Sequence, residues 1–219
     1  MATKRDRIAP TTLSRRERVR RGTVASEHLL QLFDTPESLA ASVATFIVEG
    51  HDKRERVLIV ATEPHWSAIR EEMAARKVDA EALMASGELV KLDALQLLSR
   101  FMRHGEPNRA LFQQTVGALV ADLAAAPLRI YGEMVEVLAS EGNYKGAAHL
   151  EDLWNHLSLQ HSFTLLCGYS AAHFAGPDAG SSLGIICCQH SRSFCEPHDA
   201  LSSFLLSRHQ QARAFPITR

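Results

Sequence analysis

Acidic and other polar side chains follow several of the strands that the sequence predicts, at the point where each strand ends. In an open α/β sheet, ligands usually bind beyond the carboxyl ends of the strands. Carboxylates gathered there can bind a metal, act as acid or base, or accept hydrogen bonds from a ligand. The residues concerned are Asp34, Glu63, His65, Asp93, Glu133, Tyr169 and Ser170. The set predicts a ligand site, although Asp93 and Glu133 taken singly also suit capping of the next helix.

A second group of reactive side chains lies within twelve residues near the C-terminus. The group comprises Cys187, Cys188, His190, Cys195 and His198. Two C-x-x-H pairs in one segment offer four zinc ligands. However, cysteines in an apolar run such as LGIICC more often pack as small hydrophobes. We therefore predict no metal site and no cofactor, and we leave open whether this segment binds metal.

Several motifs of classical enzymes are missing from the sequence. A phosphate loop needs glycines and a lysine after the first strand, where this chain reads DTPES. No GxGxxG follows a strand, and there is no GxSxG elbow and no HExxH. The sequence therefore predicts neither a Walker A nor a Rossmann nucleotide site, and we expect no enzymatic activity.

Short β-rich segments alternate with longer helical patterns, and these elements must position the polar groups. Strands are expected at 28–33, 56–61, 88–92, 128–131 and 163–169. Helices are expected at 36–49, 64–76, 80–85, 94–103, 108–127, 133–140, 143–159 and 197–213, with a loop at 175–182. Helices between strands require crossovers, so the pattern predicts a three-layer α/β fold with a mainly parallel sheet. Trp66, Trp154 and Cys167 are expected to be buried packing residues.

Charge divides the chain into a basic tail and an acidic remainder. Residues 1–22 hold eight of the 24 Lys and Arg residues but only two of the 25 Asp and Glu residues. We expect residues 1–25 to be a disordered tail, 26–213 a single domain and 214–219 a short C-terminal tail. No apolar run approaches the roughly 20 residues of a membrane span, and no signal peptide is recognisable. The sequence therefore predicts a cytoplasmic protein.

The central part of the chain resembles the MEDS domain, a sensory domain named for methanogens, methylotrophs and the dichloromethane-responsive repressor. The motifs that carry the resemblance are RVLIVATEPH, GELVKLDA, RIYGEMVEVL, AAHLEDLWN, FTLLCGYS and CCQHS, together with His28 in the first strand. They occur in order over about residues 26–200. The resemblance implies a RecA/KaiC-like core with a degenerate phosphate loop.

The resemblance also implies a function, which is to sense a small molecule such as a hydrocarbon derivative. From the motifs and the strand ends together, the ligand-binding candidates are Glu63, His65, Asp93, Tyr131, Glu133, Glu151 and Tyr169. We expect a non-catalytic signalling module that binds a small ligand, a signalling protein such as a histidine kinase or regulator, or both. Self-association is also compatible with the resemblance.

Two alternatives remain open from the residues alone. One is an unconventional nucleotide-binding protein or ATPase that uses Glu133 or Asp93. The other is a nucleic-acid-associated regulator that binds through the Arg-rich tail; such binding falls steeply with salt. The tail has no aromatic residues for base stacking, which makes nucleic acid the weaker partner.

Overall fold

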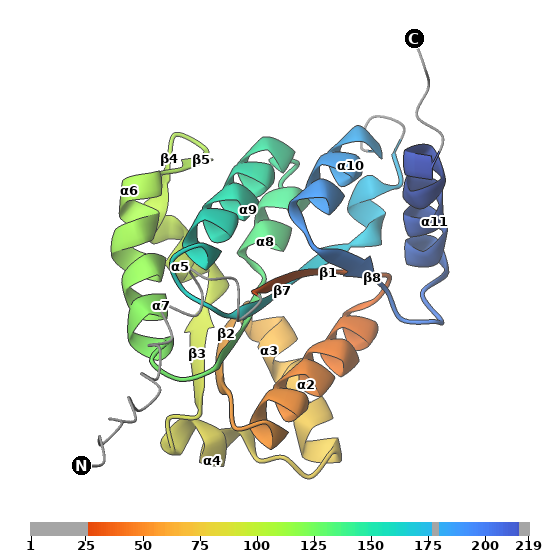
Figure 1. Cartoon of the computed structure of the whole chain (residues 1–219). Coiled ribbons are helices and arrows are strands. Elements are labelled where there is room, and N and C mark those ends of the chain that lie inside the picture. The colour runs from red at the N-terminus through yellow and green to blue at the C-terminus, as the bar shows by residue number, and fades with distance from the viewer. Residues whose placement is uncertain (1–25, 177–179, 215–219) are drawn as a thin grey trace, which may run out of the picture.

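A six-stranded parallel sheet forms the centre of the computed structural model, which describes residues 26–176 and 180–214 (Figure 1). The strands lie in the order β3-β2-β6-β7-β1-β8. They are β1 (Glu27–Phe33), β2 (Arg56–Ala61), β3 (Leu89–Asp93), β6 (Leu128–Gly132), β7 (Thr164–Ser170) and β8 (Arg192–Phe194). A separate hairpin joins β4 (Met102–Arg103) to β5 (Glu106–Pro107).

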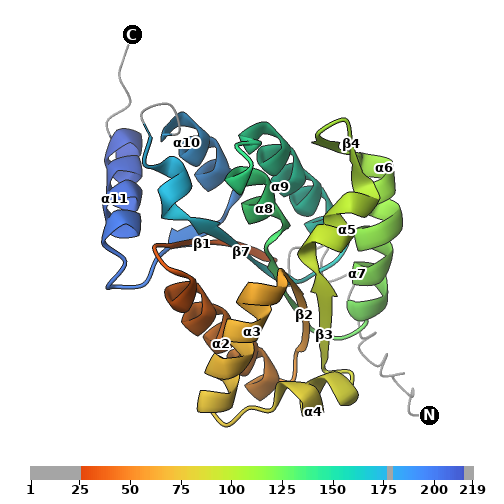
Figure 2. The ribbon, with the colours of Figure 1, turned by 180° about the vertical axis from the view of Figure 1, so that it is seen from behind.

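Helices cover both faces of the sheet, as seen from opposite sides in Figures 1 and 2. One face carries α2 (Pro36–Asp52), α3 (Glu63–Ala75) and α4 (Ala80–Ala85). The other carries α5 (Ala94–Phe101), α6 (Arg109–Phe112), α7 (Ala118–Leu123), α8 (Met134–Ser140), α9 (Tyr144–Ser158), α10 (Gly180–Gln189) and α11 (Ala200–Ala214). The predicted three-layer α/β fold with a parallel sheet is confirmed.

Strand β2 shows why the sheet is buried on both faces. Leu58 and Val60 pack in the hydrophobic core beneath α5, α8 and α9. Val57 and Ile59 point the other way, into the core beneath α2 and α3. Successive side chains of a strand alternate between faces, so a continuous apolar run suits a strand with helices on both sides.

Helix α2 begins where the sequence predicts. Thr35 accepts a hydrogen bond from the Ser38 backbone N–H, the Ser38 side chain pairs with the Thr35 backbone, and Pro36 occupies the first turn. Leu39 and Val43 then lie on the buried face. Each such fully buried side chain contributes about 1.5–3 kcal/mol to folding.

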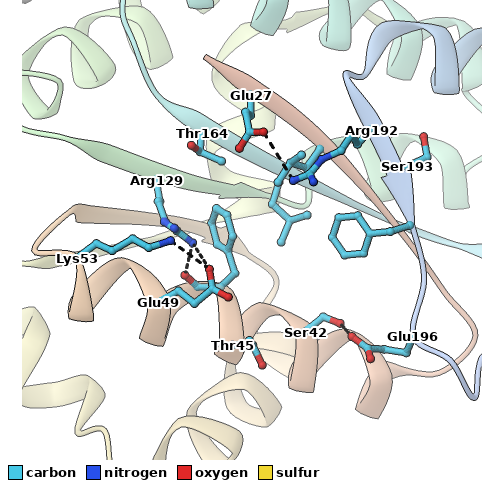
Figure 3. A pocket seen from close by; sticks show the side chains of 14 residues that line it. Glu27, Ser42, Thr45, Glu49, Lys53, Arg129, Thr164, Arg192, Ser193 and Glu196 are labelled. Atoms are coloured by element: carbon cyan, nitrogen blue, oxygen red, sulfur yellow. Dashed lines mark hydrogen bonds and ion pairs between the residues drawn. The ribbon is translucent and has the colours of Figure 1, made fainter. Parts of the chain in front are cut away.

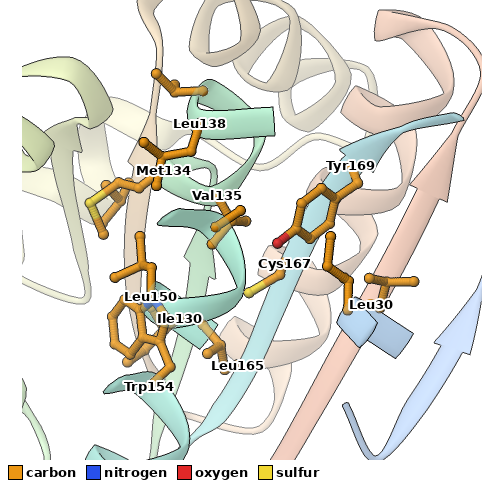
Figure 4. Packing of buried hydrophobic residues seen from close by; sticks show 14 of the residues in the cluster. Leu30, Ile130, Met134, Val135, Leu138, Leu150, Trp154, Leu165, Cys167 and Tyr169 are labelled. Carbon is orange, nitrogen blue, oxygen red and sulfur yellow. The ribbon is translucent and has the colours of Figure 1, made fainter. Parts of the chain in front are cut away.

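Helix α9 is the element that brings polar side chains into the opposite core. Asn143 caps it by accepting a hydrogen bond from the Gly146 N–H at 2.9 Å. Leu150 and Trp154 pack against the sheet, and Cys167 and Tyr169 of β7 point toward the same helical layer (Figure 4). Trp66, Trp154 and Cys167 are all buried, as predicted.

Three local predictions are wrong. The predicted loop at 175–182 overlaps α10, because Leu183, Ile186 and Cys187 lie at helical spacing on a buried face and extend the helix back over the small residues before them. The predicted helix at 108–127 ends early, at Leu123, and its middle turn is π-helical, η1 (Gln113–Gly117). The short strand β8 is missing from the prediction, since three residues give too short a pattern.

Within residues 26–176 and 180–214, no helix has the length and apolarity needed to cross a membrane. The predicted tails at 1–25 and 215–219 lie outside the described residues. Ala214, which we predict to begin the C-terminal tail, is instead the last residue of α11.

Candidate functional site

Glu133 links the end of β6 to the start of α3. Its Oε2 accepts a hydrogen bond from the Thr62 backbone N–H at 3.0 Å, and its Oε1 accepts one from Thr62 Oγ1 at 2.8 Å. His65 Nδ1 lies 2.7 Å from the same Oε1. The hydrogen bond to Glu133 raises the pKa of His65, although burial opposes the shift. Glu133 makes no side-chain cap bond to α8, so the capping interpretation is wrong for this residue.

The other predicted carboxylates at the strand ends have separate partners. Asp93 caps α5 by accepting a hydrogen bond from the Gln96 N–H at 2.8 Å, as the competing interpretation holds. Glu63 is exposed and pairs with Lys91 at 2.7 Å. Asp34 accepts hydrogen bonds from the first turn of α11. Among the ligand candidates at the strand ends, the structure therefore joins only His65 and Glu133.

Ser170 and Tyr131 also lie apart from the His65–Glu133 pair. The Ser170 N–H donates to Glu136 Oε2 at 2.9 Å, and His173 Nε2 lies 2.8 Å from the other oxygen. Tyr131 lies in the core beneath α2, where burial raises its pKa well above the usual range. A Cβ on Gly168 would stand 3.2 Å from Tyr131 Oη, so the glycine makes room for this ring.

Glu151 forms a second polar cluster, which is wholly buried on the opposite face of the sheet. Its Oε1 accepts a hydrogen bond from Tyr169 Oη at 2.8 Å. Its Oε2 lies 3.4 Å from Cys167 Sγ and 3.1 Å from His28 Nε2. His190 Nε2 lies 3.4 Å from Oε1. The four residues His28, Glu151, Cys167 and His190 each direct one potential ligand atom to a common point, with all four atoms within 4.8 Å of one another.

Four elements distant in sequence build this Glu151 cluster. His28 and Cys167 come from the adjacent strands β1 and β7, in which His28 pairs with Leu165 and Leu30 with Cys167. Because every second residue faces the same side, these side chains share a face. Glu151 projects onto that face from α9, and His190 follows α10.

The electrostatics of the cluster centre on the carboxylate. Burial acts to raise the pKa of Glu151, but His190 and His28 outweigh burial and hold that pKa well below the usual range. Burial likewise acts to lower the pKa of His28, and the Glu151 charge more than reverses it. Burial and the same charge raise the pKa values of Cys167 and Tyr169 far above normal. Glu151 is therefore an ionised carboxylate, and the neighbouring Cys167 thiol and Tyr169 hydroxyl resist losing their protons.

A sequence model of the family described as "MEthanogen/methylotroph, DcmR Sensory domain" (MEDS) matches residues 27–183. The chain belongs to the MEDS family. The match confirms the resemblance found in the sequence, to a family that is described as a sensory domain.

A comparison with curated proteins gives no match. Among solved structures, the KaiC-like protein of the hyperthermophilic archaeon Pyrococcus horikoshii OT3 is similar, with 19% identity and a TM-score of 0.46. That match covers 70% of the MEDS chain and 66%, just under two thirds, of the archaeal chain.

The Glu151 cluster contains His28, Asn155 and Cys167, which sequence reasoning missed as site residues, and His190, which it named only as a possible zinc ligand within segment 187–198. His28, Asn155, Cys167 and His190 all fall in the motifs that carry the MEDS resemblance, but strand-end logic did not select them. The cluster lies in the middle of the sheet face rather than beyond the strands. The signal that could have found the cluster is that each of its His, Cys and Glu residues lies in a motif that carries the resemblance.

The cysteine-rich segment 187–198 does not assemble into a site of its own. Cys187 packs in the hydrophobic core, Cys188 is exposed, and Cys195 lies 3.4 Å from Ser203 Oγ. Within the described residues, the one group of three or more close metal-ligating side chains takes only His190 from this segment.

A groove of about 620 Å³ lies between α2 and the edge strand β8 of this MEDS domain (Figure 3). Its apolar lining consists of the buried side chains Leu29, Phe46 and Leu166 and the exposed side chain of Phe194. Its rim holds three acidic and three basic side chains, which are Glu27, Glu49, Glu196, Lys53, Arg129 and Arg192. The groove is at the amino-terminal half of the strands, away from the Glu133 pair.

Five of the six rim charges of the groove are paired with an opposite charge, and Glu196 accepts a hydrogen bond from a hydroxyl. Arg129 pairs with Glu49 at 3.2 Å and also contacts Glu55. Arg192 lies 3.6 Å from Glu27. Ser42 donates a hydrogen bond to Glu196. A groove lined in this way favours a ligand without net charge over an anion or a cation.

Proposed function

We propose that this MEDS domain is a sensory module that binds a small uncharged ligand with an apolar body in the groove between α2 and β8. The observation that carries the proposal is the groove's composition, which combines apolar side chains with charged side chains most of which are paired with an opposite charge. Its volume falls in the usual range for small-molecule pockets, about 300–1,000 Å³. The proposal assigns the domain no catalytic step.

Residues that line the groove connect directly to the C-terminal helix, so the binding of a ligand there can affect how this helix is held. Phe194 and Glu196 line the groove and lead directly into α11 (Ala200–Ala214). Asp199 accepts a hydrogen bond from Ser38 of α2 at 2.9 Å, and Asp34 holds the first turn of α11. A ligand that contacts both α2 and β8 therefore biases how α11 is held, if its affinity differs between two arrangements. In the proposed mechanism, a signalling protein binds α11 and responds to the change in how this helix is held.

The test is a thermal-shift and calorimetric screen of the full chain. One set holds small neutral molecules, such as short alcohols, alkyl halides and dihalomethanes, and a second holds nucleotides with Mg²⁺. A ligand at 100 times its dissociation constant adds about 2.7 kcal/mol to the free energy of unfolding. We expect a member of the neutral set to raise the melting temperature.

Two matched variants locate the binding. Thr45 is exposed in the groove, and Thr45→Trp should fill it and abolish the response. Ser99 is exposed on α5, and Ser99→Trp should leave the response unchanged. A shift with nucleotides alone, or a response that survives Thr45→Trp, contradicts the groove as the sensory site.

A further inference from the structure

The Glu151 cluster has more acceptor atoms than the surrounding side chains have hydrogens to give. His190 Nδ1 lies 2.8 Å from the Ile186 carbonyl oxygen, so this nitrogen carries the hydrogen and donates it there. The Nε2 of a neutral His190 is then a bare lone pair. It is buried, makes no hydrogen bond within the described residues, and points at a carboxylate oxygen 3.4 Å away. Two lone pairs facing each other are stabilised when a proton on the imidazole or a metal ion lies between them.

His28 is oriented in the same way. Asn155 Nδ2 donates to the Gln189 carbonyl oxygen at 3.0 Å, which turns Asn155 Oδ1 toward His28. His28 Nδ1 lies 2.9 Å from that oxygen and donates to it. The Nε2 atoms of both histidines therefore face Glu151, and each ring is fixed through its other nitrogen. This is the outer arrangement that metal-ligating histidines commonly have.

The distances among three of these atoms are close to those around a small metal ion. His28 Nε2, Glu151 Oε2 and Cys167 Sγ form a triangle with sides of 3.1, 3.4 and 3.4 Å. Zinc bound at about 2.0–2.3 Å by N, O and S ligands in a tetrahedron separates its ligands by roughly 3.3–3.8 Å. His190 Nε2 supplies the fourth corner from within 4.8 Å of the other three atoms.

We propose that His28, Glu151, Cys167 and His190 bind one divalent metal ion of the zinc class in a four-coordinate site. Two imidazoles, one thiolate and one carboxylate form a ligand set of intermediate softness, which suits Zn²⁺ and excludes Mg²⁺ or Ca²⁺. Tyr169 Oη holds the carboxylate by its other edge at 2.8 Å. Binding releases to solvent the thiol proton of Cys167 and any proton carried by His28 Nε2 or His190 Nε2.

The site is of the closed, structural type, because the protein supplies all four ligands. A cleft of about 160 Å³ at the amino end of β1 is lined by His28, Asn155 and Gln189 and gives a path from solvent. The ion joins β1, β7, α9 and the end of α10. Its removal should therefore loosen α10 in particular, seen as faster amide hydrogen exchange over Leu183–Cys187.

The experiment measures metal in the full chain, purified without chelators. Elemental analysis should find about one zinc per chain. Metal-free protein titrated with Co²⁺ should develop a sulfur-to-cobalt charge-transfer band and the intense visible bands of a tetrahedral ion, saturating at one equivalent.

Variants assign the ligands. Cys167→Ser should remove the charge-transfer band, and His190→Gln should weaken Co²⁺ binding more than a hundredfold. Asn155→Ala removes the orienting contact to His28 together with the hydrogen bonds to Gln189, keeps all four ligands, and should weaken binding about 10–100-fold with the same spectrum. Cys195→Ser and His65→Gln are the matched controls and should bind as the parent does.

Three results would overturn the proposal. They are a parent chain that holds no zinc and gives no thiolate band with Co²⁺, binding that is unchanged in both Cys167→Ser and His190→Gln, and a band lost in Cys195→Ser instead. Since Asn155→Ala keeps all four ligands, it still tests the proposal where a ligand variant fails to fold.

Discussion

Glu133 and Glu151 are both buried carboxylates with a histidine within 3.1 Å, but their surroundings differ in one respect. Glu133 receives a hydrogen from a backbone N–H and one from a hydroxyl, and His65 is partly open to solvent. Glu151 meets two imidazoles whose Nδ1 hydrogens are committed elsewhere. The Glu133 group is a closed set of hydrogen bonds, whereas the Glu151 carboxylate accepts a hydrogen bond from Tyr169 and faces two imidazole Nε2 atoms, between which a metal ion can bind.

The comparison distinguishes Glu133, whose hydrogen bonds stabilise the fold, from Glu151, which lies in the proposed binding site. Glu133 connects the end of β6 to the first residues of α3 and thereby fixes the neighbouring strand ends. Glu151 connects two strands to two helices through side chains that all suit metal coordination. A buried acid–histidine pair is therefore not by itself a sign of function, and the count of available hydrogens distinguishes the two cases.

The largest expected effect comes from Glu151→Gln. It leaves two histidines without their counter-charge in a dry core, and breaking such a buried pair typically costs about 3–5 kcal/mol. Glu133→Gln is the matched variant; it weakens hydrogen bonds to a charged group worth about 1.5–3 kcal/mol. Denaturant unfolding of both variants measures the difference. Equal losses would remove the distinction between the two carboxylates.

A chelator should give a smaller and selective effect. An ion that binds only the folded chain at 100–1,000 times its dissociation constant stabilises it by about 2.7–4.1 kcal/mol. Dialysis against a zinc chelator should lower the melting temperature of the parent and of Glu133→Gln, and leave Glu151→Gln unchanged. A drop of the same size in Glu151→Gln would place the stabilising metal elsewhere.

The smallest effect concerns pH and the Glu133 pair. Because the hydrogen bond to Glu133 raises the pKa of folded His65 above 6.5, the pair stabilises the fold fully below that pH. The contribution is lost as pH rises through the raised pKa. The parent should therefore exceed His65→Gln in stability by about 1 kcal/mol at acidic pH and by less at alkaline pH. A difference that grows with pH would contradict this assignment.

The sequence predicted the layers and most elements because each depends on local pattern. The apolar run of β2 and the Thr35–Pro36 start of α2 are readable without tertiary information. Strand β8 was missed because only its pairing with β1 makes its three residues a strand. Helix α10 was partly missed because its buried face, and not its first residues, stabilises it.

The site was harder to predict because it too depends on strand pairing and helix packing, which local sequence patterns do not show. Glu133 and His65 were found because both follow neighbouring strands, and chain order brings such residues together. His28 and His190 are 162 positions apart and meet because the chain at Ser191 and β8 pairs with β1 and because α10 packs on α9. Motif resemblance named some of these residues, but only the fold shows that Glu151 lies between them.

Anomalous diffraction at the zinc edge, from crystals of the full chain grown with zinc, tests the central claim most directly. The account predicts one strong peak among His28 Nε2, Glu151, Cys167 Sγ and His190 Nε2, and none beside Glu133 and His65. A peak beside Glu133, or well-ordered Glu151 and histidine side chains with no peak between them, would contradict it.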